Sequence, residues 1–280
     1  MTLRDTIDQL LNATIQHGPL NNRIYLMHIN DAEPSALIPA LGALAKEKGY
    51  TKIFAKVPAA KAGPFFDAGY RKEAEVAGFF QGQDDAVFAC AYFDDARRIS
   101  PVQSEIDRVT TRAKNAAQLT LEPLRDLSIR QAEARDIPHM ARLYQSVFQS
   151  YPFPIQDPDY LAKTMASHVD YFLVEDRGVI AALSSAEMDI ENRNVEMTDF
   201  ATHPRYRGRR LAVHLLAHME TAMQRKGIIS AYTIARAVSY PMNLTFARRG
   251  FVFGGLLINN TNISGGMESM TVWHKPLLSV

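Results

Sequence analysis

Strand-like and helix-like segments alternate along this 280-residue chain, and the alternation limits its fold more than any other feature. Short apolar runs rich in β-branched residues predict strands, and apolar residues spaced three or four apart predict helices. In the first hundred residues, strands are predicted at 23–29, 50–57 and 87–93, and helices at 36–48 and 59–68. Farther on, strands are predicted at 170–175, 178–188, 194–202, 229–234, 251–257 and 270–275, helices at 210–226 and 241–249, and a loop at 259–269. This pattern predicts an α/β (α+β) chain in which helices pack on a sheet.

A helix start separates the two parts of the chain. Ser100 is a good helix cap, with Pro101 at the first helical position and Gln103 at the third. Apolar residues then recur at spacings of four, three and four, which predicts a helix with one apolar face to Leu119. We therefore expect an N-terminal α/β domain at 1–99, a connecting helix and linker at 100–124, and a second domain at 125–280.

The two parts share an internal echo. Gly49 followed by Phe66–Tyr70 resembles Gly227 followed by Phe246–Phe251, and in both a strand follows the first glycine and a helix precedes the second. The echo predicts that the N-terminal domain is a degenerate half of the fold of the second domain. Chance similarity of two mixed segments is the alternative. We expect such a half to cover a substrate pocket or to form a dimer interface, so a homodimer stays open.

Composition excludes several classes of protein. The 31 basic and 30 acidic residues give a net charge of +1, so no bulk field attracts nucleic acid or anionic lipid. Cys90 is the single cysteine, which excludes a disulfide framework and predicts a buried thiol. No apolar run approaches the ~18 residues that span a bilayer, and the first ten residues do not have the apolar core of a secretory signal. We expect a cytoplasmic protein that uses no metal.

The most informative segment is the basic turn from Thr202 to Ala212, between a predicted strand and a predicted helix. Four arginines fall within six residues of it, at 205, 207, 209 and 210. Unpaired N–H groups and the positive end of the dipole at a helix N-terminus bind phosphate. The turn therefore predicts a phosphate-binding site. A solvated basic loop is the alternative.

This turn resembles that of the GNAT superfamily of N-acetyltransferases, in which a proline is followed by Arg/Gln-x-x-Gly-x-Gly/Ala. Arg207 and Ala212 match, whereas Arg210 replaces the central glycine. The resemblance covers about 127–276 and implies a mixed, mostly antiparallel sheet flanked by helices, with acetyl-CoA as co-substrate. It implies that the cofactor contacts Thr202, Arg207, Gly208, Arg209, Arg210, Leu211, Ala212, Asn243 and Phe246. Phe246 also stands where many members carry a tyrosine acid, which leaves the general acid unassigned; Tyr232 and Tyr240 lie nearby.

Three further segments, 50–57, 196–202 and 255–265, resemble the β-lysine N-acetyltransferases over nearly the whole chain. That resemblance implies transfer of acetyl from acetyl-CoA to the terminal amine of β-lysine (3,6-diaminohexanoate). The product, N6-acetyl-β-lysine, serves as a compatible solute in many hosts of these enzymes. The same fold acting on another small amine, a polyamine or a protein amine is one alternative. A non-catalytic acyl-CoA sensor, favoured by Arg210 and by the absent tyrosine, is another.

The chemistry requires a base because an alkyl ammonium has a pKa of ~10.4. Glu196, on the strand that leads to the basic turn, is the candidate base, with an exposed strand-edge residue as the alternative. Asp199 would face the other way in a regular strand, but the family carries a bulge here that turns both toward one cleft. We expect Asp199 to seat a substrate ammonium, unless it pairs with an arginine. Asn259 and Asn260, in the predicted loop, are expected to border the acceptor pocket.

Overall fold

The N-terminal half contains more strands than the sequence pattern predicts. The computed structural model describes residues 5–263 and 265–278. The elements of this half are β1 (Thr6–Leu10), β2 (Ala13–Gly18), β3 (Arg23–His28), α1 (Pro34–Lys48), β4 (Lys52–Pro58), α2 (Gly63–Asp67), β5 (Arg71–Phe80) and β6 (Asp84–Tyr92). The pattern missed β1, β2 and β5. Strand β1 is almost wholly exposed and β5 begins with Arg-Lys-Glu, so neither has the apolar run that marks a strand.

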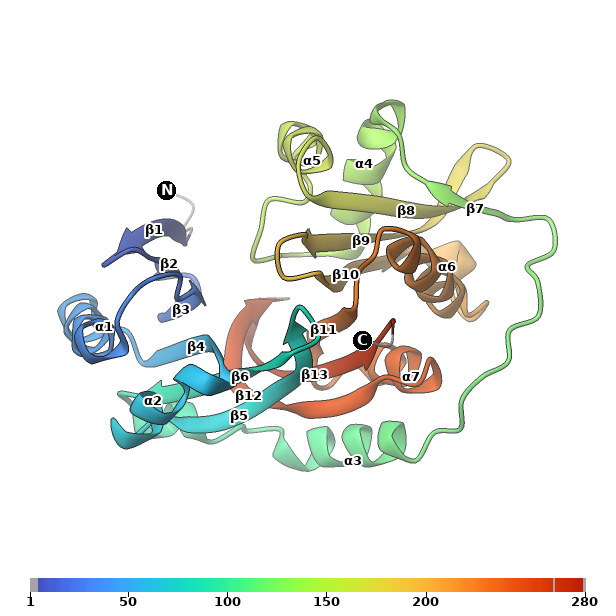
Figure 1. Cartoon of the computed structure of the whole chain (residues 1–280). Coiled ribbons are helices and arrows are strands. Elements are labelled where there is room, and N and C mark those ends of the chain that lie inside the picture. Colours follow the sequence, from blue (N-terminus) through green and yellow to red (C-terminus); the bar gives the residue numbers. More distant parts are fainter. Residues whose placement is uncertain (1–4, 264, 279–280) are drawn as a thin grey trace.

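A connecting helix, α3 (Gln103–Lys114), lies alongside the second half (Figure 1). The elements of the second half are β7 (Ser128–Gln131), α4 (Ile137–Val147), α5 (Pro158–Met165), β8 (Val169–Asp176), β9 (Val179–Asp189), β10 (Asn194–Thr202), α6 (Leu211–Arg225), β11 (Ser230–Arg236), α7 (Tyr240–Arg248), β12 (Val252–Ile263) and β13 (Gly266–Pro276). Short 3-10 turns lie at 59–61, 95–98, 134–136 and 204–206. Helices α6 and α7 match their predicted bounds to within one residue. Helix α3 is shorter than predicted and is capped by Val102 rather than Ser100.

The predicted loop at 259–269 is wrong. Strand β12 continues to Ile263 and β13 begins at Gly266. A run of polar residues is typical of a loop. Here these residues belong to strands, because their polar groups are buried against polar partners in the N-terminal half. For example, the backbone N–H of Asn262 donates to Oδ1 of Asn21 at 2.7 Å.

The strands form a single sheet in the order β1-β2-β3-β4-β6-β5-β12-β13-β11-β10-β9-β8-β7. Neighbours are antiparallel except for β3–β4 and β10–β11, so the predicted mixed, mostly antiparallel sheet is confirmed. The order β3-β4-β6-β5 in the first half repeats as β10-β11-β13-β12 in the second. In both halves a helix follows each of the first two strands. The N-terminal half is therefore a reduced copy of the second, as the echo predicts.

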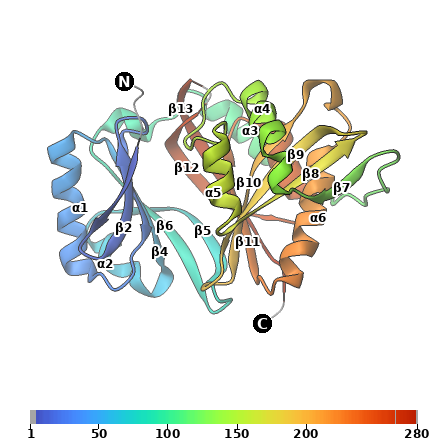
Figure 2. The ribbon, with the colours of Figure 1, turned by 90° about the horizontal axis from the view of Figure 1, so that it is seen from above.

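The two halves join where β5 pairs antiparallel with β12, at Ala74 and Gly255 (Figure 2). The backbones pass so closely that a Cβ on Gly255 would lie 2.2 Å from the carbonyl oxygen of Glu73. Buried apolar residues of both halves form one cluster here, including Phe88, Cys90 and Tyr232. Cys90 is fully buried, as predicted. The repeats share one sheet, and we keep the boundaries at 99 and 124 as proposed domain limits.

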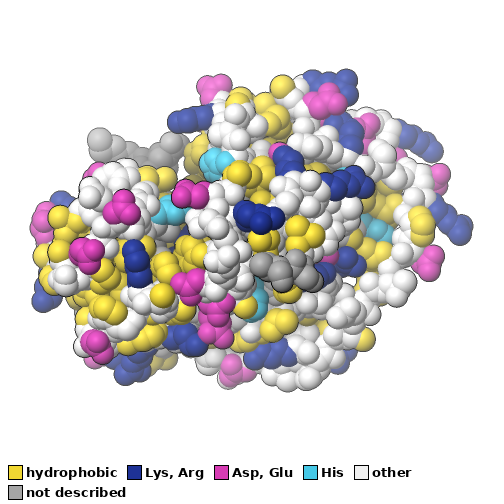
Figure 3. Space-filling view, in the orientation of Figure 1, with side chains coloured by type: hydrophobic (Ala, Val, Ile, Leu, Met, Phe, Trp, Pro, Cys, Tyr) yellow, Lys and Arg dark blue, Asp and Glu magenta, His cyan; other side chains and the backbone are white. Residues whose placement is uncertain are grey.

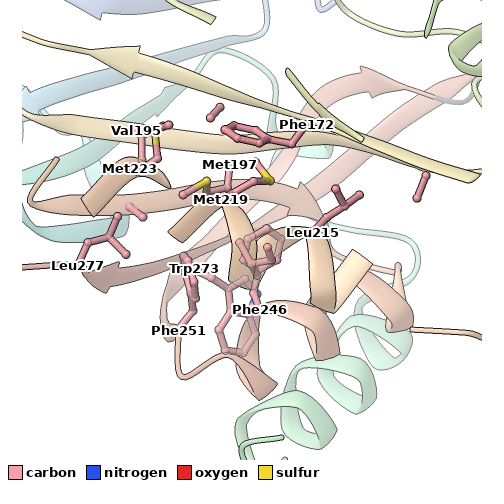
Figure 4. Close-up of a cluster of buried hydrophobic side chains, with 14 of the residues drawn as sticks. Phe172, Val195, Met197, Leu215, Met219, Met223, Phe246, Phe251, Trp273 and Leu277 are labelled. Atoms are coloured by element: carbon pink, nitrogen blue, oxygen red, sulfur yellow. The ribbon is translucent and has the colours of Figure 1, made fainter. Parts of the chain in front are cut away.

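A second apolar cluster fixes α6 and α7 against the sheet (Figure 4). Phe246 lies inside it, with its ring 5.5 Å from that of Phe200 and 5.1 Å from that of Phe251. On the surface, acidic and basic side chains are interspersed over the face seen in Figure 3. None of the helices in residues 5–263 and 265–278 is long and apolar enough to cross a bilayer.

Candidate active site

Strands β10 and β11 pair at one end and separate at the other. Their parallel pairing covers Asn194–Glu196 and Ser230–Tyr232. Beyond it, β10 continues to Thr202 and β11 to Arg236 while the strands diverge. The divergence leaves a wedge in the middle of the sheet, directly after Glu196.

A β-bulge in β10 changes which way its side chains face. Thr198 pairs with Ser185 but Ala201 pairs with Leu183, so β10 holds one extra residue, and Asp199 has a left-handed φ of 56°. Glu196 and Asp199 therefore line one cavity although they are three residues apart. The bulge that the resemblance implied is confirmed. Beyond it, Phe200 and Thr202 line a different cavity, next to α6.

That second space, of about 480 Å³, lies between the end of β10 and the first turns of α6 and α7. We call it the arginine cavity. It is lined by Val147, Phe200, Thr202, Tyr206, Arg207, Gly208, Arg210, Leu211, Ala212, Val213, Tyr240, Pro241, Met242, Leu244, Thr245 and Arg248. The first N–H groups of α6 have no partner within the helix and carry the positive end of its dipole. Arg207 and Arg210 beside this helix start suit a phosphate group, and Arg248 at the end of α7 adds a third cation to the lining.

The backbone conformation of Arg210 shows why the family pattern has a glycine at this position. We expected it to begin the helix, but α6 begins at Leu211 and Arg210 precedes it with a left-handed φ of 58°. Glycine adopts this conformation freely, whereas another L-residue loses roughly 1–2 kcal/mol. The arginine keeps the backbone turn of a glycine and adds a cation to the lining of the arginine cavity.

Three predicted cofactor contacts lie elsewhere. The Nδ2 of Asn243 donates to the carbonyl of Ser239 at 2.8 Å, and its Oδ1 accepts from Nε1 of Trp273 at 2.9 Å. This buried amide therefore holds α7 to β13. Phe246 belongs to the apolar core instead of the cavity, because it points inward from α7 (Figure 4). Arg209 lies over the ring of Tyr206 and lines a separate surface hollow.

The cavity on the Glu196 side of β10 measures about 220 Å³ and has walls from both halves. We call it the carboxylate cavity. Its acidic residues are Glu187, Asp189, Glu196 and Asp199, and β2, β3 and β4 contribute Gln16, Arg23, Tyr25, Met27, His28, Phe54 and Lys56. The loop after α4 adds Tyr151, Pro152 and Phe153. The reduced half thus lines a cavity, in keeping with the first of the two roles expected for it.

Burial raises the pKa values of acidic groups in this cavity. It raises the pKa of Glu196 to about 7, against the opposing effects of the Lys56 ammonium and a hydrogen bond with Tyr232. Burial also raises the pKa of Asp199, whose oxygens accept from Ser185 Oγ at 2.6 Å and from the Tyr151 hydroxyl at 2.5 Å. Glu196 is therefore near its midpoint at neutral pH, as suits a group that accepts a proton.

Glu187 belongs to the same group of acids, although no sequence motif indicates it. It lies directly opposite Glu196 across β9 and β10. Burial, and then the charges of Asp199 and Glu196, raise its pKa well above the usual range. The register of the β9–β10 hairpin could have revealed Glu187. Asp189 pairs with Asn194, and two residues farther from the turn on each strand Glu187 pairs with Glu196.

Buried cations of the N-terminal half bind three successive carbonyls of β12. Lys52 Nζ donates to the carbonyl of Ile258 at 2.8 Å and Arg97 Nε to that of Asn259 at 2.6 Å. Arg23 Nη1 donates to the carbonyl of Asn260. These contacts fix the segment of β12 that reaches the carboxylate cavity.

The two asparagines that were expected at the acceptor pocket therefore lie in different surroundings. The side-chain amide of Asn259 donates to the carbonyls of Arg97 and Ile99, at 3.0 and 2.9 Å, and so braces the chain after β6. Asn260 lines the carboxylate cavity, and its buried Oδ1 has no donor among residues 5–263 and 265–278. The expected acceptor contact is dropped for Asn259 and kept for Asn260.

The geometry supports one class of chemistry. At the bulge of β10, adjacent residues line different cavities: Asp199 lines the carboxylate cavity and Phe200 lines the arginine cavity. The arginine cavity suits a phosphate-bearing ligand, and the carboxylate cavity suits an amine. The carboxylates of the latter attract an ammonium and can remove its proton. This arrangement suits acyl transfer to an amine.

Comparison with known proteins agrees. Residues 138–251 match the model of the acetyltransferase (GNAT) family. The chain is 38% identical to a β-lysine N6-acetyltransferase of Methanococcus maripaludis, over 97% of this chain and 98% of that protein. It is 32% identical to a β-lysine N6-acetyltransferase of Methanosarcina mazei, over 85% and 96%. It is 31% identical to the N-acetyltransferase YodP of Bacillus subtilis, over 95% and 97%. The chain therefore belongs to the GNAT family of acetyltransferases.

Proposed function

We propose that the protein transfers acetyl from acetyl-CoA to the terminal amine of β-lysine, giving N6-acetyl-β-lysine. The observation that carries this proposal is the carboxylate cavity, which places buried acids of one half opposite cations of the other. An acceptor with ammonium groups and a carboxylate complements such a lining. Relatives named for β-lysine match the chain through both halves, including the half that supplies the cations.

Acetyl-CoA, as co-substrate, supplies an acetyl group already activated as a thioester. The residues of the arginine cavity fit its phosphates: Arg207 and Arg210 provide charge, and the start of α6 provides N–H groups. Glu196 takes the proton of the acceptor ammonium, which otherwise costs about 4–5 kcal/mol to remove at pH 7. The amine nitrogen then bonds to the acetyl carbon as the carbon–sulfur bond breaks. The sulfur leaves as a thiolate, which at a pKa of ~8.5 needs little help from an acid. The nitrogen's second proton then passes to this thiolate, which leaves a neutral amide and the free thiol of CoA.

Arg207→Ala is expected to weaken acetyl-CoA binding by ~1.5–3 kcal/mol, since it removes hydrogen bonds to a charged group. Isothermal titration calorimetry measures the change. Arg209→Ala is the matched control, because Arg209 belongs to the same turn but lines a different hollow. An Arg209 variant that loses as much affinity as the Arg207 variant would place the phosphates elsewhere on the turn.

Asp199→Asn is expected to raise KM for β-lysine about tenfold with a smaller change in kcat, because it removes a negative charge from the site for the ammonium groups. Ser185→Ala is the matched control. It removes one hydrogen bond to Asp199 and keeps the charge, so its KM should stay within about threefold of the wild type. Steady-state kinetics decide. A loss of kcat at unchanged KM in Asp199→Asn would assign the base to Asp199.

The product fits the role of a compatible solute, which we propose for it in the cytoplasm. β-Lysine carries two ammonium groups and one carboxylate at pH 7, a net charge of +1 by reference pKa values, and acetylation leaves a neutral zwitterion.

Release of free thiol from acetyl-CoA, measured with β-lysine, α-lysine, a polyamine and a lysine-containing peptide, tests the function. We expect the highest kcat/KM with β-lysine. Preference for another amine would keep the reaction and replace the acceptor. Binding of acetyl-CoA with no thiol release from any amine would favour the acyl-CoA sensor.

A further inference from the structure

Arg23 is a buried cation that lines the carboxylate cavity and forms no ion pair within residues 5–263 and 265–278. Its side chain is 5% exposed and lies over the rings of Tyr25 and Phe54, at 5.6 and 5.2 Å. Nη1 donates to the backbone of Asn260 and to Oγ1 of Thr261, the latter at 3.2 Å. Within residues 5–263 and 265–278, its Nε is buried with no acceptor and the guanidinium forms no ion pair with a carboxylate.

This isolation contrasts with the neighbouring cation of β4. Lys52 is fully buried too, but its ammonium meets the carboxylate of Glu73 at 2.8 Å. A buried charge is normally paired, because removing it from water is costly. Burial lowers the pKa of Arg23 only to about 10, so it is charged at neutral pH. The Arg23 guanidinium is thus left ready for an anion that enters the cavity.

Asn260 complements Arg23 at the same place. Its carbonyl already binds the guanidinium, and its side-chain Oδ1 is a buried acceptor without a donor in the described part of the chain. Among residues 5–263 and 265–278, Arg23 thus has an unpaired donor, and Asn260, whose carbonyl it contacts, has an unpaired acceptor. A carboxylate with an ammonium nearby on the same carbon chain would satisfy both.

We propose that Arg23 and Asn260 form a subsite for the amino-acid head of the acceptor. Arg23 binds the carboxylate, and Oδ1 of Asn260 accepts from the ammonium next to it. The acceptor's terminal amine is then directed to the carboxylates of β9 and β10. This inference rests on the proposed function and adds to it a specificity-determining pair supplied partly by the half without the basic turn.

The test compares acceptors that differ by one group. Pentane-1,4-diamine is β-lysine without its carboxylate, and 6-aminohexanoate is β-lysine without its inner amine. The wild type should prefer β-lysine to pentane-1,4-diamine in kcat/KM by at least about 100-fold, since the analogue leaves a buried cation unpaired. Arg23→Gln should lower kcat/KM about 100-fold for β-lysine and less than about tenfold for pentane-1,4-diamine. Asn260→Ala should lower it more for β-lysine than for 6-aminohexanoate.

Arg97→Gln is the matched control. Arg97 binds the adjacent carbonyl of β12 but is absent from the lining of the carboxylate cavity, so its variant should affect both diamines equally. An equal loss for both diamines in Arg23→Gln would make Arg23 merely structural and overturn the subsite. If that variant does not fold, Arg23→Lys replaces it, and the preference for β-lysine should still fall about tenfold. If the wild type turns over β-lysine and pentane-1,4-diamine equally, the subsite is refuted and the proposed function stands. If no amine releases thiol from acetyl-CoA, the proposed function is refuted.

Discussion

Glu196→Gln is expected to lower kcat near pH 7 by about 100–10,000-fold, the contribution of a general base. Glutamine keeps the size of the side chain and its place in the carboxylate cavity, and it cannot accept the proton. The wild-type rate should rise with pH through about 7, where Glu196 loses its proton in the buried site. The variant's rate should instead climb steadily toward pH 10, because the amine then loses its proton in solution. Thiol release measured between pH 6 and pH 10 separates the two profiles.

Folding provides the control for this variant. Burial raises the pKa of Glu196 to about 7 from a usual value near 4.5, so the folded state binds its proton more tightly than the unfolded state. The stabilisation from protonated Glu196 is complete at pH values below its pKa in the unfolded state. It is lost as the pH rises through its pKa in the folded state. The loss is on the order of 3 kcal/mol at pH 8. Glu196→Gln should therefore melt higher than the wild type at pH 8 and near it at pH 4. If Glu196→Gln keeps the wild-type kcat at pH 7, Glu196 is not the general base, and Asp199 becomes the next candidate.

Gly255→Ala is expected to destabilise the protein by about 3 kcal/mol or more, because it places a methyl group where β12 meets β5. The new Cβ would lie 2.2 Å from a carbonyl oxygen of β5 and 2.5 Å from the Cα of Ala74. Gly255 also has a φ of 149°, which L-residues rarely adopt. Overpacking alone costs roughly 1–3 kcal/mol, and the backbone strain adds to it. Urea denaturation gives the change in the free energy of unfolding.

Gly42→Ala is the matched control. Gly42 lies within α1, and a Cβ there would meet nothing within 4 Å. Alanine in a helix interior should stabilise by roughly 0.5–1 kcal/mol. At temperatures where both variants remain folded, Gly255→Ala should also raise KM for the acceptor, because the strand that presents Asn260 shifts. Equal stability of the two variants would contradict the tight join between the halves.

Local chemistry made part of this site predictable. Helices α6 and α7 carry apolar faces and a glycine or basic stop, so their bounds matched to within one residue. Two of the four arginines of the basic turn, Arg207 and Arg210, also line the arginine cavity, whereas Arg205 and Arg209 do not. Asn243 misled because a polar side chain near a functional motif also serves as a buried hydrogen-bonding hub.

The unpredicted part depends on contacts between distant segments. Arg23 and Asn260 are 237 positions apart and meet only through the pairing of the halves. Glu187 joined the site through the hairpin register, and β12 extended past its apolar run because N-terminal cations bind its carbonyls. No periodicity along the chain encodes those partners.

The junction of the sheet has an evolutionary consequence. Strands β5 and β12 occupy equivalent places in the two repeats, and they pair antiparallel. Two copies of one subunit related by a two-fold axis would meet in the same way. The chain thus has the architecture of a dimer joined into a single polypeptide by duplication. Fusion frees the two copies from identical sequence, so one can lose its cofactor turn and diverge to recognise the acceptor while the other retains the transfer chemistry.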